Sequence, residues 1–207
     1  MSVSEDRTVQ PTATPVSGIA DPAPLGLAAF ATTTFLLSAA NANWMGAASG
    51  AAFLGYAFAY GGFIQLLAGM WEFRNRNVFG ATAFSTYGGF WIGLGLWVLL
   101  VAGNPKLTAL QLGHDKAWIV LAFAIVNTYL LILSTQLTTA VFLVFLTLEA
   151  TEILLFAGGF ANSTGLVKAG GIVGVITAVV AWYTSAAGIS IGIGGKLRFP
   201  VGPPLIK

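Results

Sequence analysis

Six long runs of apolar residues constrain the fold of this chain more than any other feature. They cover approximately residues 25–40, 47–71, 80–102, 117–137, 138–160 and 166–191. A helix needs about 20 such residues to cross the hydrocarbon core of a bilayer. Membrane-spanning strands would show short segments of apolar and polar alternation instead, and these runs do not. The sequence therefore predicts an all-α integral membrane protein with six transmembrane helices.

Charge and reactive side chains are scarce, which excludes several classes of function. Charged residues make up 8% of the chain, against about a quarter in ordinary soluble proteins. The basic residues are scattered, so no patch indicates nucleic-acid binding. The chain has no cysteine and a single histidine, His114, so thiol catalysis and a metal site built from cysteine or histidine are not expected. We predict neither an enzyme nor a bound cofactor.

The polar segments divide the chain into three parts. Residues 1–20 are polar, lack the apolar core of a signal peptide and are expected to form a disordered N-tail. Residues 21–195 form the six-helix transmembrane domain, in which 104–116 is predicted to be a polar loop, and 196–207 form a C-tail. The side that holds both tails carries six of the nine basic residues. The positive-inside rule then places both termini in the cytoplasm.

Two polar motifs lie at membrane depth. The first is Asp-Pro-Ala-Pro-Leu-Gly-Leu at residues 21–27. Proline suits the first turn of a helix, and a preceding Asp can cap its free amides, although the same amides could bind a carboxylate ligand. The second motif, residues 60–88, places Gln65, Thr82, Thr86 and other hydrogen-bonding groups within apolar helices. Such groups join helices or line a pathway, and their density favours a pathway.

Pairs of glycines recur at the spacing of close helix contacts. Gly89 and Gly93 in the third run, and Gly170 and Gly174 in the sixth, are four residues apart. Small residues at this spacing let helix backbones approach closely in lipid. We expect these pairs to pack helices within one subunit, with contacts between subunits as the alternative.

The two motifs resemble those of a known family. The first is similar to the Asn-Pro-Ala-Pro-Leu-Gly-Leu signature of the acetate uptake transporter (AceTr, YaaH-type) family, and residues 60–90 are similar to a second block of that family. Together they cover the first three helices, whereas similarity beyond residue 105 is diffuse. The resemblance implies a cyclic hexamer in the cell membrane, with a pore through each six-helix subunit.

The resemblance also implies site residues. An apolar constriction made by a Phe, a Tyr and a Leu falls on Phe30, Tyr87 and Leu146. Such a ring tends to exclude water and opposes the passage of an anion, so a carboxylic acid would cross as the neutral acid or with a proton. The candidates for substrate binding or pore lining are Asp21, Pro22, Leu25, Gln65, Thr86 and Asn127.

The implied function is a transporter or channel for acetate and similar short carboxylates, coupled to protons. The alternative is a pore for small neutral or cationic solutes such as ammonia or urea. A structural or signalling membrane protein without transport is a third class, and the intramembrane carboxylates argue against it.

Glu149 and Glu152 depart from the family pattern as apolar residues are expected there. They lie near the middle of the fifth run at a spacing of i, i+3, so they share one face of a helix. Two nearby carboxylates in a low dielectric resist simultaneous ionisation. They are therefore candidates for proton handling, and a hydrogen-bond network between subunits is the alternative.

Overall fold

Every regular element in the computed structural model, which describes residues 18–45 and 52–206, is a helix. Six helical segments are long and apolar enough to span a membrane, which confirms the predicted fold class. The segments are α1 (Ala23–Asn41), α2 (Phe53–Phe58) continued through the π-helical η2 (Ala59–Ile64) into α3 (Gln65–Arg74), α4 (Val78–Trp97) with η3 (Val98–Ala102), α5 (Ala109–Ser134), α6 (Thr139–Phe160) and α7 (Thr164–Gly192).

The helices start and end close to the predicted limits, with one clear exception. Helix α5 begins at Ala109, so residues 109–116 are helical, and the prediction of a loop over all of 104–116 was wrong. The cause is a capping box: Thr108 Oγ1 accepts from the Gln111 amide at 3.2 Å, and the Gln111 side chain accepts from the Thr108 amide at 2.9 Å. The predicted N-tail up to residue 17 and the predicted helical start at 47–51 lie outside the described residues.

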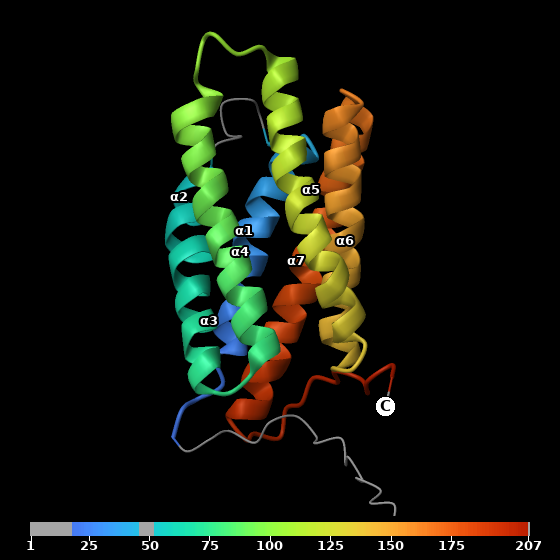
Figure 1. Cartoon of the computed structure of the whole chain (residues 1–207). Helices are drawn as coiled ribbons and strands as arrows, with labels where there is room; N and C mark the ends of the chain where they lie inside the picture. The colour runs from blue at the N-terminus through green and yellow to red at the C-terminus, as the bar shows by residue number, and fades with distance from the viewer. Residues whose placement is uncertain (1–17, 46–51, 207) are drawn as a thin grey trace, which may run out of the picture.

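The helices form an upright bundle in which each segment packs against its neighbours (Figure 1). The most extensive contacts between helices are those of α1 with α7, followed by α6 with α7, α5 with α6 and α3 with α4, whereas α4 and α5 touch only slightly. The glycines of α7 serve this packing: a Cβ at Gly170 would lie 2.9 Å from the Leu155 side chain. Gly89 and Gly93 instead face open space, so the expectation of packing within the subunit holds for α7 and not for α4.

The two described ends of the chain lie at one end of the bundle, which we call the terminal face (Figure 1). The α3–α4 and α5–α6 links lie there as well. The segment after α7 folds back on this face, where the Ala140 amide donates to Val201 O at 2.8 Å and Tyr183 OH donates to Pro200 O at 2.6 Å. The opposite end, the far face, holds the end of α1 and the start of α5.

Candidate functional site

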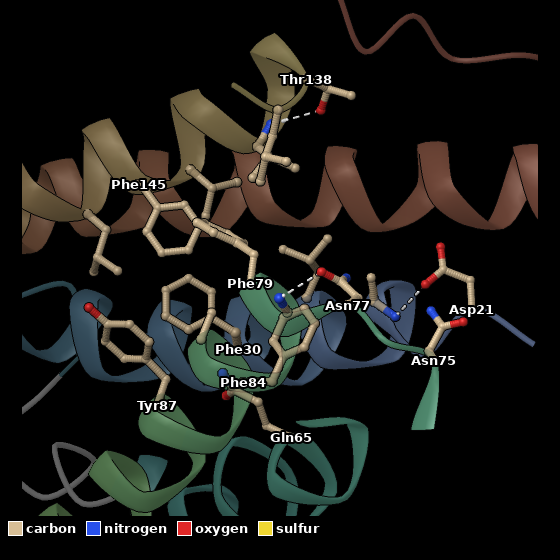
Figure 2. Close-up of a pocket in the computed structure, with 18 residues that line it drawn as sticks. Asp21, Phe30, Gln65, Asn75, Asn77, Phe79, Phe84, Tyr87, Thr138 and Phe145 are labelled. Atoms are coloured by element: carbon tan, nitrogen blue, oxygen red, sulfur yellow. Dashed lines mark hydrogen bonds between the residues drawn. The ribbon is translucent and has the colours of Figure 1, made fainter. Parts of the chain in front are cut away.

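A wide cavity of about 350 Å³ enters the bundle from the terminal face, between α1, α3, α4 and α6. Figure 2 shows Asp21 and Asn75 at one end of this cavity and Tyr87 at the other. The walls between them are mainly aromatic and aliphatic, with Phe79, Phe84 and Phe145 among the lining residues. The cavity thus changes from a polar mouth to an apolar inner end.

Three helices begin at the mouth of the wide cavity, each with a side-chain oxygen bonded to its first amides. Asp21 Oδ1 accepts from the Ala23 amide at 3.0 Å in α1, and Asn77 Oδ1 accepts from the Gly80 amide at 3.1 Å in α4. Thr138 Oγ1 accepts from the Val141 amide at 3.3 Å in α6 (Figure 2). The helix N-termini carry partial positive charge, and the Asp21 carboxylate at the same mouth carries negative charge. Asp21 is both a cap and a cavity residue.

A narrow cavity of about 40 Å³ lies on the other side of Tyr87, toward the far face. Its lining includes the polar side chains of Asn41, Lys116 and Glu152 and the indole of Trp91. The wide and narrow cavities share three lining residues, Phe30, Tyr87 and Leu148. All three are buried, and the rings of Phe30 and Tyr87 meet edge to face with centroids 5.7 Å apart. We call these three residues the septum, because they separate the two cavities.

The septum contains Phe30 and Tyr87, as predicted, but not Leu146. The Leu146 side chain is 42% exposed on the outside of α6 and lines neither cavity, whereas Leu148 is only 6% exposed. Side chains that are two residues apart in an α-helix point in directions that differ by about 200°. An assignment that is wrong by two residues therefore points to the opposite face of the helix, and Leu148 replaces Leu146.

Some of the remaining candidates for pore lining face a cavity in the structure, and others do not. Gln65, which is buried, and Asp21, which is exposed, both line the wide cavity. Leu25 does not: it is 47% exposed and lines neither cavity, because it faces outward from the first turn of α1. Pro22 is buried and Thr86 is half-buried, and neither of them lines a cavity.

Asn127 and the two glutamates form one hydrogen-bond network with Tyr87. Tyr87 OH lies 3.2 Å from both Asn127 Oδ1 and Glu152 Oε1. Asn127 Nδ2 donates to Glu149 Oε2 at 2.7 Å, and Thr128 Oγ1 donates to Glu149 Oε1 at 2.9 Å. Glu152 lines the narrow cavity, whereas Glu149 lines neither cavity. The two glutamates, which were predicted to share a helix face, therefore have different surroundings.

Sequence analysis did not identify Lys116, Asn41 and Trp91 as candidates for this site. Lys116 was assigned to a loop, but it lies in α5, and its Nζ donates to Asn41 Oδ1 at 3.3 Å. A charged residue next to an apolar run was the available signal, since intramembrane charges usually face the bundle interior. Its approach to α1 depends on tertiary packing. Among the described residues, no cluster of His, Asp and Glu could hold a metal ion.

Known proteins share both the sequence and the architecture of this chain. Acetate permease A of Emericella nidulans is 41% identical over 196 residues, which cover 88% of this chain and 65% of the relative. The succinate-acetate/proton symporter SatP of Escherichia coli is 31% identical and covers 89% of this chain and 96% of its own length. Several fungal relatives are longer, and the chain spans only 63–65% of their length.

A solved structure agrees with the sequence comparison. The structure of the bacterial acetate channel SatP superposes with a TM-score of 0.81 at 26% identity, covering 89% of this chain and 100% of that one. The sequence pattern of the GPR1/FUN34/yaaH family matches residues 6–194, which include α1, the septum residues and all of α7. With both motifs, the six spans and the shared architecture in agreement, this chain belongs to the GPR1/FUN34/yaaH family.

Proposed function

We propose that this chain conducts acetate and similar short carboxylates across the plasma membrane, with both termini in the cytoplasm. The observation that carries the proposal is the meeting of two cavities, one on the terminal side and one on the far side of the bundle, at Phe30, Tyr87 and Leu148. These residues would form the constriction of the pathway. The acetate-related names of the relatives support the same substrate class.

The chemistry of the path suits a weak acid. The partial positive charge of the helix N-termini near Asn77 and Thr138 supports an anion at the mouth, although the Asp21 carboxylate opposes it. The apolar septum opposes an unpaired charge. A carboxylic acid that is protonated near pH 4–5, by analogy with Glu, avoids most of this cost when it crosses with a proton. Glu149 and Glu152 are the groups that we propose for proton handling.

Labelled acetate is expected to enter proteoliposomes faster when the outside is more acidic than the inside. The gradient drives the acid inward and traps it as the anion. Because acetic acid also crosses lipid unaided, protein-free liposomes of the same composition are the control. Uptake that is no faster with the protein, in either gradient direction, would contradict the proposal.

Ammonium is a second candidate substrate, favoured by the lining of the narrow cavity. Glu152 lies there among Phe30, Tyr87, Phe90 and Trp91, and a carboxylate with aromatic faces is a site that attracts cations. Lys116 in the same cavity opposes this. Competition in the acetate assay separates the two: succinate is expected to compete, whereas inhibition by ammonium or urea alone would favour the second candidate.

We also propose that six copies assemble into a ring, as the family resemblance implies. Large apolar side chains cover much of the outer surface, including Leu96, Leu100 and Ile125, and these side chains face either lipid or a neighbouring subunit. In mild detergent, the protein mass after subtraction of bound detergent is expected to be six times the 21.5 kDa of one chain. A stable monomer or dimer in several mild detergents would argue against the ring.

A further inference from the structure

The hydroxyl of Tyr87 lies between two acceptors. Its oxygen is 3.2 Å from Asn127 Oδ1 and 3.2 Å from Glu152 Oε1, and both contacts are buried. A phenol carries one proton and donates to one acceptor at a time. If Glu152 is ionised, one of the two contacts therefore brings two oxygens together with no proton between them.

The orientation of Asn127 is fixed by its other partners, so its amide cannot rotate to supply the missing proton. Asn127 Nδ2 lies 3.0 Å from Phe145 O and 2.7 Å from Glu149 Oε2. The Phe145 carbonyl oxygen can only accept, so it can bond Asn127 only through the amide nitrogen. The nitrogen must therefore face these two groups, and the oxygen must face Tyr87.

A proton on Glu152 completes the network in one direction. Glu152 Oε1–H then donates to Tyr87 Oη, Tyr87 donates to Asn127 Oδ1, and Asn127 donates to Glu149. Every member has a partner of the right kind, which matters because an unpaired polar group in a low dielectric is costly. Glu152 Oε2 has no hydrogen-bond partner among the described residues, which further disfavours a buried carboxylate ion.

The surroundings of Glu152 contain few other ionisable groups. Tyr87 on α4 and Glu149 on α6 belong to the network itself, and Lys116 on α5 lines the narrow cavity. Helix α1 contributes the uncharged Thr34, Ser38 and Asn41 to that cavity, and no α7 residue is among its lining residues. In the part of the chain that the structure describes, Lys116 is thus the one basic residue that lines the narrow cavity, which is the cavity into which Glu152 would release its proton.

We infer that Glu152 is a protonated positioning residue for Tyr87, so that its proton occupancy sets the hydrogen bonding of the septum. This inference rests on the proposed role of the septum as the constriction. With the proton in place, Tyr87 donates to Asn127. When the proton leaves to water or to a carboxylate ion in the narrow cavity, the Tyr87 hydroxyl turns to the Glu152 carboxylate and releases Asn127.

Infrared difference spectra test the protonation state without any transport assay. Wild type and variants are compared near neutral pH in a detergent without ester groups, since esters absorb near the carboxylic acid C=O stretch. Glu152→Gln is expected to lose one protonated-carboxyl band relative to wild type. Glu149→Gln is expected to retain it, and Tyr87→Phe to shift it, because Phe cannot accept the hydrogen bond. Buried Glu72 is present in every sample, so its absorption cancels in the difference spectra.

The result that overturns the inference is equally specific. If Glu152→Gln elutes like wild type in size-exclusion chromatography and its spectrum lacks this loss, Glu152 is ionised and the inference fails. A protonated-carboxyl band that disappears in Glu149→Gln instead would assign the proton to the other glutamate, with the same consequence. A wild type that shows the Glu152 band but no protein-dependent acetate uptake would contradict the proposed function and not the protonation of Glu152.

The pH dependence of acetate transport adds a second test, because it would not change if Glu152 had a purely structural role. Gln at position 152 donates permanently to Tyr87 and so mimics the protonated acid. With equal pH on both sides, the ratio of acetate exchange in Glu152→Gln to that in wild type cancels the ionisation of acetate itself. This ratio is expected to change several-fold between acidic and alkaline pH, whereas the same ratio for Leu146→Ala, whose side chain lines neither cavity, stays constant. A pH-independent ratio for Glu152→Gln contradicts the switch.

Discussion

Replacing Leu148 with alanine is expected to broaden the range of carboxylates that cross the membrane. Leu148 is buried in the septum with Phe30 and Tyr87, so the substitution removes bulk where the two cavities meet. The uptake of butyrate relative to acetate is expected to rise on the order of tenfold, which corresponds to about 1.4 kcal/mol off the barrier for the larger acid. Competition between the two labelled acids in proteoliposomes measures this ratio.

Leu146→Ala is the matched control, because it makes the same chemical change two residues away. Its side chain is 42% exposed on the outside of α6 and lines neither cavity. The butyrate-to-acetate ratio should therefore stay at the wild-type value. Phe30→Ala, which opens the septum from α1, is expected to act in the same direction as Leu148→Ala. If folded Leu148→Ala and Phe30→Ala both keep the wild-type ratio, the septum is not the constriction.

The sequence was sufficient to predict the fold class because the hydropathy of the chain shows the number and the approximate limits of the membrane-spanning helices. Continuous apolar runs of spanning length leave helices as the only structure that satisfies the backbone in lipid. The start of α5 was missed for a related reason. Residues 109–116 include His114 and Lys116 and look like a loop on a hydropathy scale, whereas the Thr108–Gln111 capping box continues the helix beyond the apolar run.

The candidate site was only partly predictable, and the errors have physical causes. Phe30 and Tyr87 belong to motifs with a fixed sequence pattern, and the structure brings them into edge-to-face contact. Helix α6 is apolar on nearly every side, as a helix in lipid can be, so leucines at 143, 146 and 148 give no periodic signal to show which one faces inward. Only the packing of α6 on α5 and α7 sets that direction.

The glutamate pair shows how much spacing alone can establish. The i, i+3 separation predicts that both side chains lie on one side of α6, and the structure connects both to one network through Tyr87 and Asn127. The spacing could not predict that Glu149 would accept from Asn127 and Thr128 while Glu152 meets Tyr87. Those partners come from α4 and α5, so the different environments of the two carboxylates arise from tertiary structure.

Gly171→Ala is expected to lower the stability of the protein, because Gly171 lies where α7 contacts the end of α1. A Cβ at Gly171 would lie 2.6 Å from the Asn41 carbonyl carbon and 2.7 Å from Ser38 O, and it would also meet the Ala42 amide. These are backbone atoms, which cannot rotate away as a flexible side chain can. The two helices must separate, at a cost of about 1–3 kcal/mol or more.

Gly93→Ala makes the same substitution inside α4 where a Cβ meets nothing within 4 Å, so it is expected to leave the stability unchanged or to raise it by up to about 1 kcal/mol through helix propensity. Thermal unfolding of the two purified variants in the same detergent measures the difference, and Gly171→Ala is expected to unfold at a clearly lower temperature. Because α1 also carries Phe30 and Asn41, separation of α1 from α7 would disturb both cavities, and the surviving protein should conduct acetate less well. Equal stability of the two variants would show that α1 and α7 are not packed as closely as described.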